Sequence, residues 1–268
     1  LLVSQHPIEM KTGESTRGTY CFPLYVYNNT EQEKRKRSGS SAFTLSLFEG
    51  QEAYQTRQPN LSQAFLAAVK DKLGLGFVPE GRGDLEENFG PEDIFHYAYA
   101  VFHAPTYRER YAEFLKIDFP RLPLTGDLEL FRALVEKGRE LVSLHLMEAD
   151  VLQQTGVRYP VSGSDRVASR HPRYLSPGEP NPEGGQPLRA GRVYLNKEQY
   201  FEGIEPDVWE FQIGGYQVLD KWLKDRKRAD RALDFDDVRH YGRIVVALRH
   251  TIRLMAEIDE LIPGWPLR

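Results

Sequence analysis

The chain has 268 residues and a net charge of −4, which is unlike the strongly basic composition of proteins that coat nucleic acid without regard to sequence. Its 40% hydrophobic and 28% charged residues are typical of a globular domain with a real core. The sequence holds no run of about 18 apolar residues that would predict a membrane span. The single cysteine, Cys21, excludes an internal disulfide framework and indicates a reducing, cytoplasmic location. The first residue is leucine rather than methionine, which favours a piece of a longer chain.

The N-terminal quarter of the sequence predicts a strand, a polar loop and a helix. Residues 19–27, TYCFPLYVY, are rich in aromatic and β-branched residues and predict a strand. The polar segment that follows contains the run 34–37, KRKR, and predicts a loop. A helix is expected at 61–73 with Gly74 beyond its end, and residues 76–90 are expected to form a linker.

Two helices are predicted to meet at Pro105. Residues 90–104 are apolar almost all round the helix, a pattern typical of a buried helix, and Pro91 suits its first position. Pro105 ends this helix and begins a second, charged one. Residues 119–124, FPRLPL, are expected to run extended because each proline disfavours helix at the residue before it. We interpret this whole region as a structural scaffold rather than as a surface that binds a ligand.

The C-terminal half alternates helices with loop-rich or extended stretches. We expect a helix at 126–149, a loop-rich region at 150–190 and a strand with a turn at 191–203. Residues 208–227 should begin extended and become helical after Gly215.

The last helix is the clearest element of the sequence. It is predicted at 235–262, about 42 Å long at 1.5 Å per residue, with Asp234 and Asp237 as a weak form of capping box. Opposite its apolar stripe lie Arg239, Arg243, His250 and Arg253. This charged side is either a solvated face or a ridge that follows DNA phosphates.

A search for catalytic groups gives no convincing site. Residues 13–19, GESTRGT, have the glycine spacing of a phosphate-binding loop but lack its lysine. Residues 207–212, DVWEFQ, weakly resemble an acidic nuclease core, with Gln212 at the position of the expected lysine. We favour a core strand there, with Trp209, Phe211 and Ile213 on one face.

The histidines and the cysteine are more simply structural. His96 and His103 could share a helix face, but no cysteine or carboxylate stands at ligand spacing, so packing or surface roles are favoured. Cys21 lies in an apolar strand with no histidine close in sequence. We therefore predict no catalytic residue and no metal ligand in this chain.

Basic clusters are the remaining functional signal. They lie largely on predicted loops, and arginine can pair with guanine through two hydrogen bonds, although charge runs are often merely solvated. The candidate DNA-binding residues are Lys34, Arg35, Lys36, Arg37, Arg166, Arg170, Arg173, Lys224, Arg226, Lys227, Arg239 and Arg243.

Several blocks of the sequence resemble one protein family in the same order along the chain. Two of them are YCFPLYVY at 20–27 and PEDIFHYAYAVFHAPTYRERYAEFLKIDFPRLPL at 91–124. The others are GRVYLNKEQYFEGIEPDVWEFQIGGYQVLDKWLKDRK at 191–227 and HYGRIVVALRHTIRLMAEID at 240–259. These blocks resemble the C-terminal specificity region of Type ISP restriction-modification enzymes, which join nuclease, helicase, adenine-N6 methyltransferase and target recognition in one polypeptide.

The resemblance implies an α+β domain over residues 1–268, with an irregular β-containing recognition lobe packed against a helical part that has a long C-terminal helix. The lobes would be 1–125 and 126–268. The implied function is sequence-specific recognition of double-stranded DNA, next to a methyltransferase domain of the same polypeptide. S-adenosylmethionine, ATP and Mg²⁺ would belong to neighbouring domains, and the Asn-Pro-Pro-Tyr/Phe tetrapeptide of adenine methyltransferases is absent from the sequence.

Two other functions stay open from the sequence. The chain could be a coupling domain that docks the methyltransferase onto the motor, in which case an apolar surface is expected. It could also be a self-contained metal-dependent nuclease, in which case carboxylates, Asp207 and Glu210 among them, should cluster around a metal.

Overall fold

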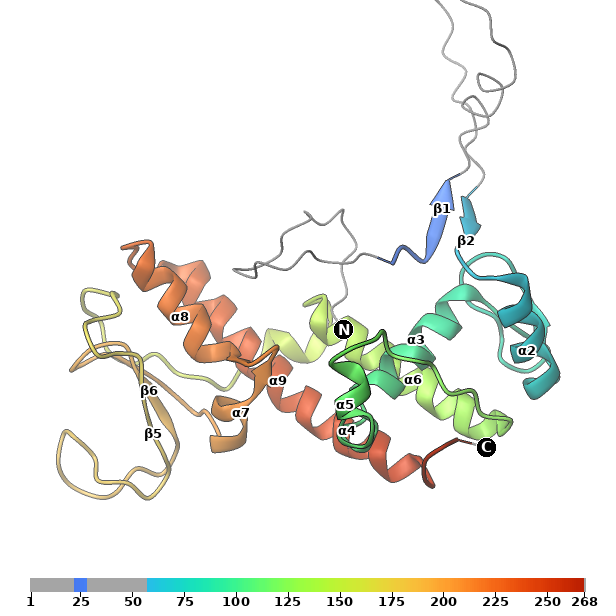
Figure 1. The fold of residues 1–268 in the computed structure, drawn as a ribbon. Helices are drawn as coiled ribbons and strands as arrows, with labels where there is room; N and C mark the ends of the chain where they lie inside the picture. The colour runs from blue at the N-terminus through green and yellow to red at the C-terminus, as the bar shows by residue number, and fades with distance from the viewer. Residues whose placement is uncertain (1–21, 28–56, 268) are drawn as a thin grey trace, which may run out of the picture. The chain divides into compact units, whose positions relative to one another are not determined.

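The computed structural model describes residues 22–27 and 57–267, and these divide into two compact units (Figure 1). Unit 1 runs to Arg139 and takes in the C-terminal residues from Leu261, whereas unit 2 comprises Glu140–Glu260. The chain combines many helices with small sheets and a long C-terminal helix, so the predicted mixture of α and β structure is confirmed. Cys21, the GESTRGT segment and the predicted loop at 34–37 lie outside the described residues.

Unit 1 contains two pairs of short strands. β1 (Tyr25–Tyr27) is antiparallel to β2 (Arg57–Pro59), so within the described part of the predicted strand 19–27 residues 25–27 form a strand. β3 (Gly76–Phe77) is parallel to β4 (Asn88–Phe89). The prediction of a plain linker at 76–90 is therefore wrong. Local hydrogen bonds order this segment, because the Asp84 carboxylate accepts the backbone amides of the three residues from 86 to 88.

Helix α2 (Gln63–Leu73) forms as the sequence predicts. The Ser62 hydroxyl accepts the amide of Phe65 at 3.2 Å and caps the N-terminus. Gly74 ends the helix with a φ of +69°, a left-handed conformation that glycine adopts without steric cost.

Helix α3 (Pro91–His103) is buried nearly all round, and α4 (Pro105–Arg110) and α5 (Ala112–Leu115) follow it. The extended arm at 119–124 is held against these helices by two phenols. The Tyr97 hydroxyl donates to the Pro123 carbonyl and the Tyr107 hydroxyl to the Arg121 carbonyl, both at 2.8 Å. These contacts fix the arm on its own helices.

Helix α6 (Leu128–His145) is shorter than the predicted 126–149, and the division between the units falls inside it. Within unit 1, Gly138 lies directly against the backbone of α3. A Cβ atom at this position would lie 1.8 Å from the carbonyl oxygen of His96, so only glycine permits the approach.

Unit 2 contains the end of α6, a short 3-10 helix (Asp150–Gln153) and an antiparallel sheet of three strands in the order β5-β6-β7. The strands are β5 (Arg173–Leu175), β6 (Arg192–Tyr194) and β7 (Tyr200–Glu202). The region from 150 to 190 is loop-rich as predicted, with β5 inside it, and the strand-and-turn pattern at 191–203 is the β6–β7 hairpin.

The segment after the sheet differs from its prediction. Residues 206–210 form helix α7 (Pro206–Glu210), so the expected core strand through Trp209, Phe211 and Ile213 is wrong. Pro206 at the first helical position and Asp207 in the first turn favour a helical turn. Trp209 stacks on Tyr174 with ring centroids 5.4 Å apart, while 44% of the Ile213 surface is exposed.

A hairpin and two helices complete unit 2. β8 (Gln212–Ile213) and β9 (Tyr216–Gln217) turn through two glycines into α8 (Val218–Arg228). Helix α9 (Phe235–Leu261) then follows, and its predicted cap forms, because Asp234 and Asp237 each accept the other's backbone amide.

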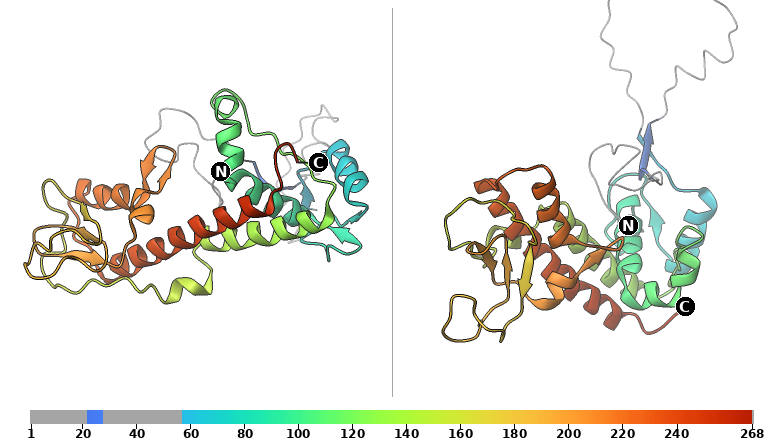
Figure 2. Two further views of the ribbon diagram at one scale, coloured as in Figure 1. Left: turned by 90° about the horizontal axis from the view of Figure 1, so that it is seen from below. Right: turned by 60° about the vertical axis from the view of Figure 1, so that its left-hand side comes forward.

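Sheet, α8 and the first half of α9 share one apolar core (Figure 2). The fully buried side chains of this core include Val193, Leu195, Phe201, Leu219, Leu223, Tyr241 and Val245.

None of the described helices combines the length and the apolar character needed to cross a membrane.

Candidate nucleic-acid interface

One end of the β5–β6–β7 sheet collects loops from separate parts of unit 2. The strand register places Arg173, Tyr194 and Tyr200 side by side at this end. Because β6 is antiparallel to both neighbours, the β6–β7 turn and the segment that leads into β5 emerge together. A backbone hydrogen bond of 2.8 Å from the Ala168 amide to the Leu195 carbonyl joins the two.

The C-terminal end of α8 lies against the same segment. The ammonium of Lys227 donates to the His171 carbonyl at 3.2 Å. Just beyond the helix, the Leu233 amide donates to the Asp165 carbonyl at 2.7 Å. Helix α8 is therefore fixed beside the loops at this end of the sheet.

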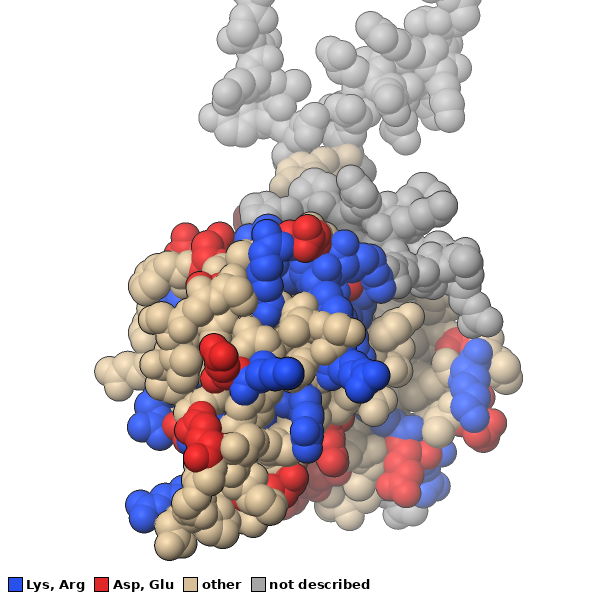
Figure 3. Space-filling view, turned by 90° about the vertical axis from the view of Figure 1, so that its left-hand side faces the viewer, with Lys and Arg blue, Asp and Glu red and all other residues tan. Residues whose placement is uncertain are grey.

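This arrangement brings together cations that have no acidic partner among residues 22–27 and 57–267. Four cations lie on the segment before β5, the first residue of β5, the β6–β7 turn and α8. In the part of the chain that the structure describes, no ion pair joins a carboxylate to any of them. Figure 3 shows Lys and Arg side chains gathered on the face of unit 2 that carries α8 and the sheet. The four cations, which we call the basic end, are Arg170, Arg173, Lys197 and Lys227.

Of the five other predicted DNA-binding residues that the structure describes, four are held by carboxylates: Arg166, Lys224, Arg226 and Arg239. Arg166 pairs with Asp230 at 2.7 Å, and Lys224 pairs with Asp220 at 2.7 Å. A cation paired in this way contributes less positive potential and must exchange partners to bind a phosphate. These side chains are therefore weaker candidates than the four of the basic end.

Arg226 is held by both a ring and a carboxylate. Its guanidinium lies 3.2 Å from the centroid of the Trp222 ring and 3.4 Å from Asp237. Burial lowers the pKa of Arg226, although the charge of Asp237 opposes this change. The side chain packs α8 onto the start of α9, which is a structural role.

The basic side chains of α9 also have partners within unit 2. Arg239 pairs with Asp236 at 3.3 Å, and Arg253 pairs with Glu257 at 3.2 Å. The half-buried Arg243 donates to the Met147 carbonyl at 2.5 Å. The pairing of these residues favours the solvated-face interpretation over a phosphate ridge.

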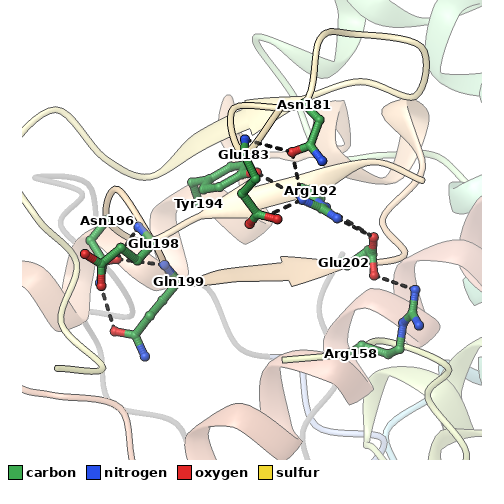
Figure 4. Close-up of polar contacts among 9 residues, drawn as sticks. All are labelled: Arg158, Asn181, Glu183, Arg192, Tyr194, Asn196, Glu198, Gln199 and Glu202. Carbon is green, nitrogen blue, oxygen red and sulfur yellow. Dashed lines mark hydrogen bonds and ion pairs between the residues drawn. The ribbon is translucent and has the colours of Figure 1, made fainter. Parts of the chain in front are cut away.

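The opposite end of the sheet is closed by a network of neutralised charges (Figure 4). Glu202 accepts from Arg192 at 3.1 Å and from Arg158 at 2.5 Å. The Arg192 guanidinium lies 4.0 Å from the Tyr200 ring centroid and also donates to Asn181. This network fastens the sheet and neutralises Arg158 and Arg192 at this end.

The candidates for catalysis and metal binding do not converge. His96 and His103 are both buried, which agrees with the packing role favoured from the sequence, and the His103 ring contacts the Tyr99 carbonyl at 2.7 Å. Asp207 and Glu210 are exposed on α7. Among residues 22–27 and 57–267, no group of three or more His, Cys, Asp or Glu side chains is placed to hold a metal ion.

One predicted basic cluster is not described by the structure, and one cation of the basic end was not predicted. The cluster Lys34–Arg37 lies outside the described residues. Lys197 was missed by the sequence reasoning, because a single lysine in the NKEQ stretch does not stand out by charge density. The signal that could have found it is the polar turn between two runs rich in valine, leucine and tyrosine, where a hairpin tip is expected.

Comparison with solved structures shows a related fold. The chain is 21% identical to a chain of the cryoEM structure of a DrdV–DNA complex, with a TM-score of 0.51 over 76% of this chain and 20% of that one. It is 16% identical to the ATP-dependent Type ISP restriction-modification enzyme LlaBIII bound to DNA, with a TM-score of 0.53 over 92% of this chain and 14% of that one. This chain thus spans a fifth or less of each. No curated protein matches its sequence.

The family described as the Type ISP C-terminal specificity domain matches residues 1–257. That range includes all of unit 2 except its last three residues, and with it the whole basic end. The chain therefore belongs to the family of Type ISP C-terminal specificity domains.

Proposed function

We propose that this chain recognises a specific double-stranded DNA sequence for a restriction-modification enzyme, and that the basic end of unit 2 contacts the duplex. The observation that carries this proposal is the group of cations at the basic end, which have no carboxylate partner among the described residues. Such side chains can bind phosphates without first breaking an ion pair.

Support also comes from how the cations are presented. They lie on the segment before β5, the first residue of β5, the β6–β7 turn and the end of α8. Backbone hydrogen bonds and the bond from the Lys227 ammonium to the His171 carbonyl join these parts, so the backbone positions that carry the cations are fixed before any ligand arrives. Contacts to phosphates position a protein on DNA, whereas contacts to base edges give sequence preference. The basic end is suited to the first task and lies beside polar loops suited to the second.

We further propose that the chain acts within a longer polypeptide that methylates adenine and cleaves DNA. LlaBIII, which has a similar fold, is described as an ATP-dependent Type ISP restriction-modification enzyme bound to DNA, and it is much longer than this chain. S-adenosylmethionine, ATP and Mg²⁺ would then bind in neighbouring domains, and the methyltransferase domain would be the intramolecular partner.

The salt dependence of DNA binding tests the role of the basic end. The variant combining Arg170→Ala, Arg173→Ala and Lys227→Ala removes three cations that form no ion pair in the described part of the chain. Because each phosphate contact contributes about 0.9 to the slope of log affinity against log salt, we expect that slope to become shallower by about 2 to 3. Fluorescence anisotropy with a labelled duplex, at several salt concentrations, measures it in the intact protein.

A matched control removes the same charge from ion-paired sites. Arg166→Ala, Lys224→Ala and Arg239→Ala each break a pair with an aspartate. We expect this triple variant to change the slope by less than about 1. Equal slopes for the two triple variants would show that the basic end has no special part in binding.

One observation favours the coupling function for unit 1. Phe22 is 69% exposed, Ile117 86% and Phe119 52%, and the rings of Phe22 and Phe119 meet edge to face at 5.4 Å. An exposed apolar group of this kind is typical of a surface that packs against another domain. The partner would be the methyltransferase domain of the same polypeptide, since the relatives of similar fold are at least five times as long as the aligned region.

A variant with Ile117→Ser and Phe119→Ser tests this second function in the intact protein. Loss of domain docking should expose new sites to limited proteolysis, while the salt slope of DNA binding stays unchanged. An unchanged proteolysis pattern would remove the support for docking through this group.

A further inference from the structure

Gln199 is a buried amide whose whole hydrogen-bonding capacity is used. Only 1% of its surface is exposed. Its Oε1 accepts from the Asp165 amide and from Asn196 Nδ2, both at 2.9 Å. Its Nε2 donates to Asp165 Oδ1 at 2.6 Å and to the Val161 carbonyl at 3.1 Å. Three of these bonds tie the 161–165 loop to the β6–β7 turn, and the bond with Asn196 lies within the turn.

Asn196 fixes the turn in the same way (Figure 4). Its Oδ1 accepts the amides of Glu198 and Gln199 at 3.0 and 2.8 Å. Besides its bond to Gln199, its Nδ2 donates to the Arg166 carbonyl at 3.3 Å. Both amide side chains are therefore fully occupied inside the protein and are not free to contact a ligand.

A third side chain completes the support beneath the loop. The Tyr159 hydroxyl donates to Asp165 Oδ1 at 2.9 Å, and the Tyr159 ring packs on Phe201 with centroids 4.7 Å apart. Burial raises the pKa of Tyr159, and the hydrogen bond to the Asp165 carboxylate raises it further, so the phenol remains a donor. The loop and the turn are thus anchored to the core of unit 2.

Four polar residues remain exposed on this fixed support: Ser162, Ser164, Lys197 and Glu198. No hydrogen bond or ion pair engages any of their side chains within the described structure. A turn that only connects two strands does not require a partly buried network of four side chains centred on a buried amide. A turn that must hold polar groups at set positions for a ligand does.

We propose that Lys197 and Glu198 read base edges in the DNA major groove, and that Gln199 and Asn196 are the positioning residues that hold them there. This inference rests on the proposed function. Lysine donates to the O6 and N7 acceptors of guanine, and glutamate accepts from the N4 amino group of cytosine. Lys197 and Glu198 both lie on the β6–β7 turn. If Arg170 and Arg173 bind phosphates of the duplex, a groove of the DNA would lie beside this turn.

The repulsion between a carboxylate and DNA makes Glu198 the sharper test of this proposal. A carboxylate near phosphates weakens affinity for every sequence unless it gains a base contact. Glu198→Gln should therefore change preference at one base pair, with the discrimination against wrong bases there falling about tenfold or more. Selection of bound duplexes from a random library by the intact protein, followed by sequencing, measures this preference.

Glu210→Gln is the matched control, because Glu210 is also an exposed glutamate of unit 2 and stands on α7. We expect it to leave the preferred motif unchanged. If Glu198→Gln also leaves the motif of the wild type unchanged, Glu198 is a solvated surface group and the inference is overturned. If the wild type selects no motif at all, the proposed function fails as well, so the two failures are distinguishable.

Gly163→Ala tests the positioning role without changing any charge. A Cβ atom at residue 163 would lie 2.7 Å from the side-chain amide carbon of Gln199, so the amide must shift. We expect weaker discrimination at the base pair that Glu198→Gln affects, with an unchanged salt slope. Retained discrimination, in a variant whose melting temperature has fallen, would show that the network serves stability alone.

Discussion

His96 is a titratable side chain that folding places where a positive charge is costly. It is 9% exposed, and its Nδ1 has no hydrogen-bond partner in the structure. Burial, assisted by the nearby charges of Arg82 and Arg139, lowers the pKa of His96 from 6.5 to about 4. Between these pH values the unfolded chain binds the extra proton, so the free energy of unfolding falls as the pH falls through this window.

The pH dependence of unfolding checks this property. From the lowered pKa of His96, we expect the free energy of unfolding to decrease by about 2 kcal/mol when the pH falls from 7 to 5. Urea titrations of the wild type and of His96→Leu at both pH values isolate the contribution, because the carboxylates are common to both. His171→Gln serves as the control and should keep the dependence of the wild type. An identical pH dependence in His96→Leu would contradict the account.

At the residue scale, local signals were readable from the sequence and distant partners were not. Ser62 and the Asp234–Asp237 pair act within three residues of their own position, so the chain order reveals them. Gln199 bonds to groups 34 and 38 residues away. Nothing in its sequence neighbourhood distinguishes it from an ordinary exposed glutamine.

At the element scale, the contact of α3 with α6 depends on one glycine. Gly138→Ala would force a methyl group into the His96 carbonyl, which belongs to a helix backbone and cannot move aside. We expect a loss of about 1–3 kcal/mol or more, seen as a lower melting temperature by circular dichroism. Gly126→Ala is the control, because its Cβ would lie an ordinary 3.7 Å from the Lys72 carbonyl. Equal melting temperatures for the two variants would contradict the packing.

The long helices were predictable and the short strands were not. The pattern for α9 extends over 27 residues, so its apolar stripe and cap agree with each other. β3 and β4 have two residues each, too few for any alternation to be visible. In DVWEFQ the alternation of Trp209 and Phe211 indicated a strand, but the proline and aspartate before them favour one turn of helix.

At the scale of the whole molecule, the distribution of charge carries more information than its sum. A net charge of −4 excludes strongly basic behaviour, yet unit 2 gathers Arg170, Arg173, Lys197 and Lys227 at one end of a sheet. The sequence showed where cations are dense but not which of them have acidic partners. That distinction depends on contacts such as Arg166 with Asp230, which lie 64 residues apart.

The measurement that tests the central claim most directly is selection of bound sequences from a library of random duplexes by the intact protein, at physiological salt. If the chain reads DNA sequence, the bound pool should converge on one motif, and the triple variant of Arg170, Arg173 and Lys227 should recover far less DNA. A bound pool with the same base composition as the input library would contradict the proposed recognition of a specific DNA sequence.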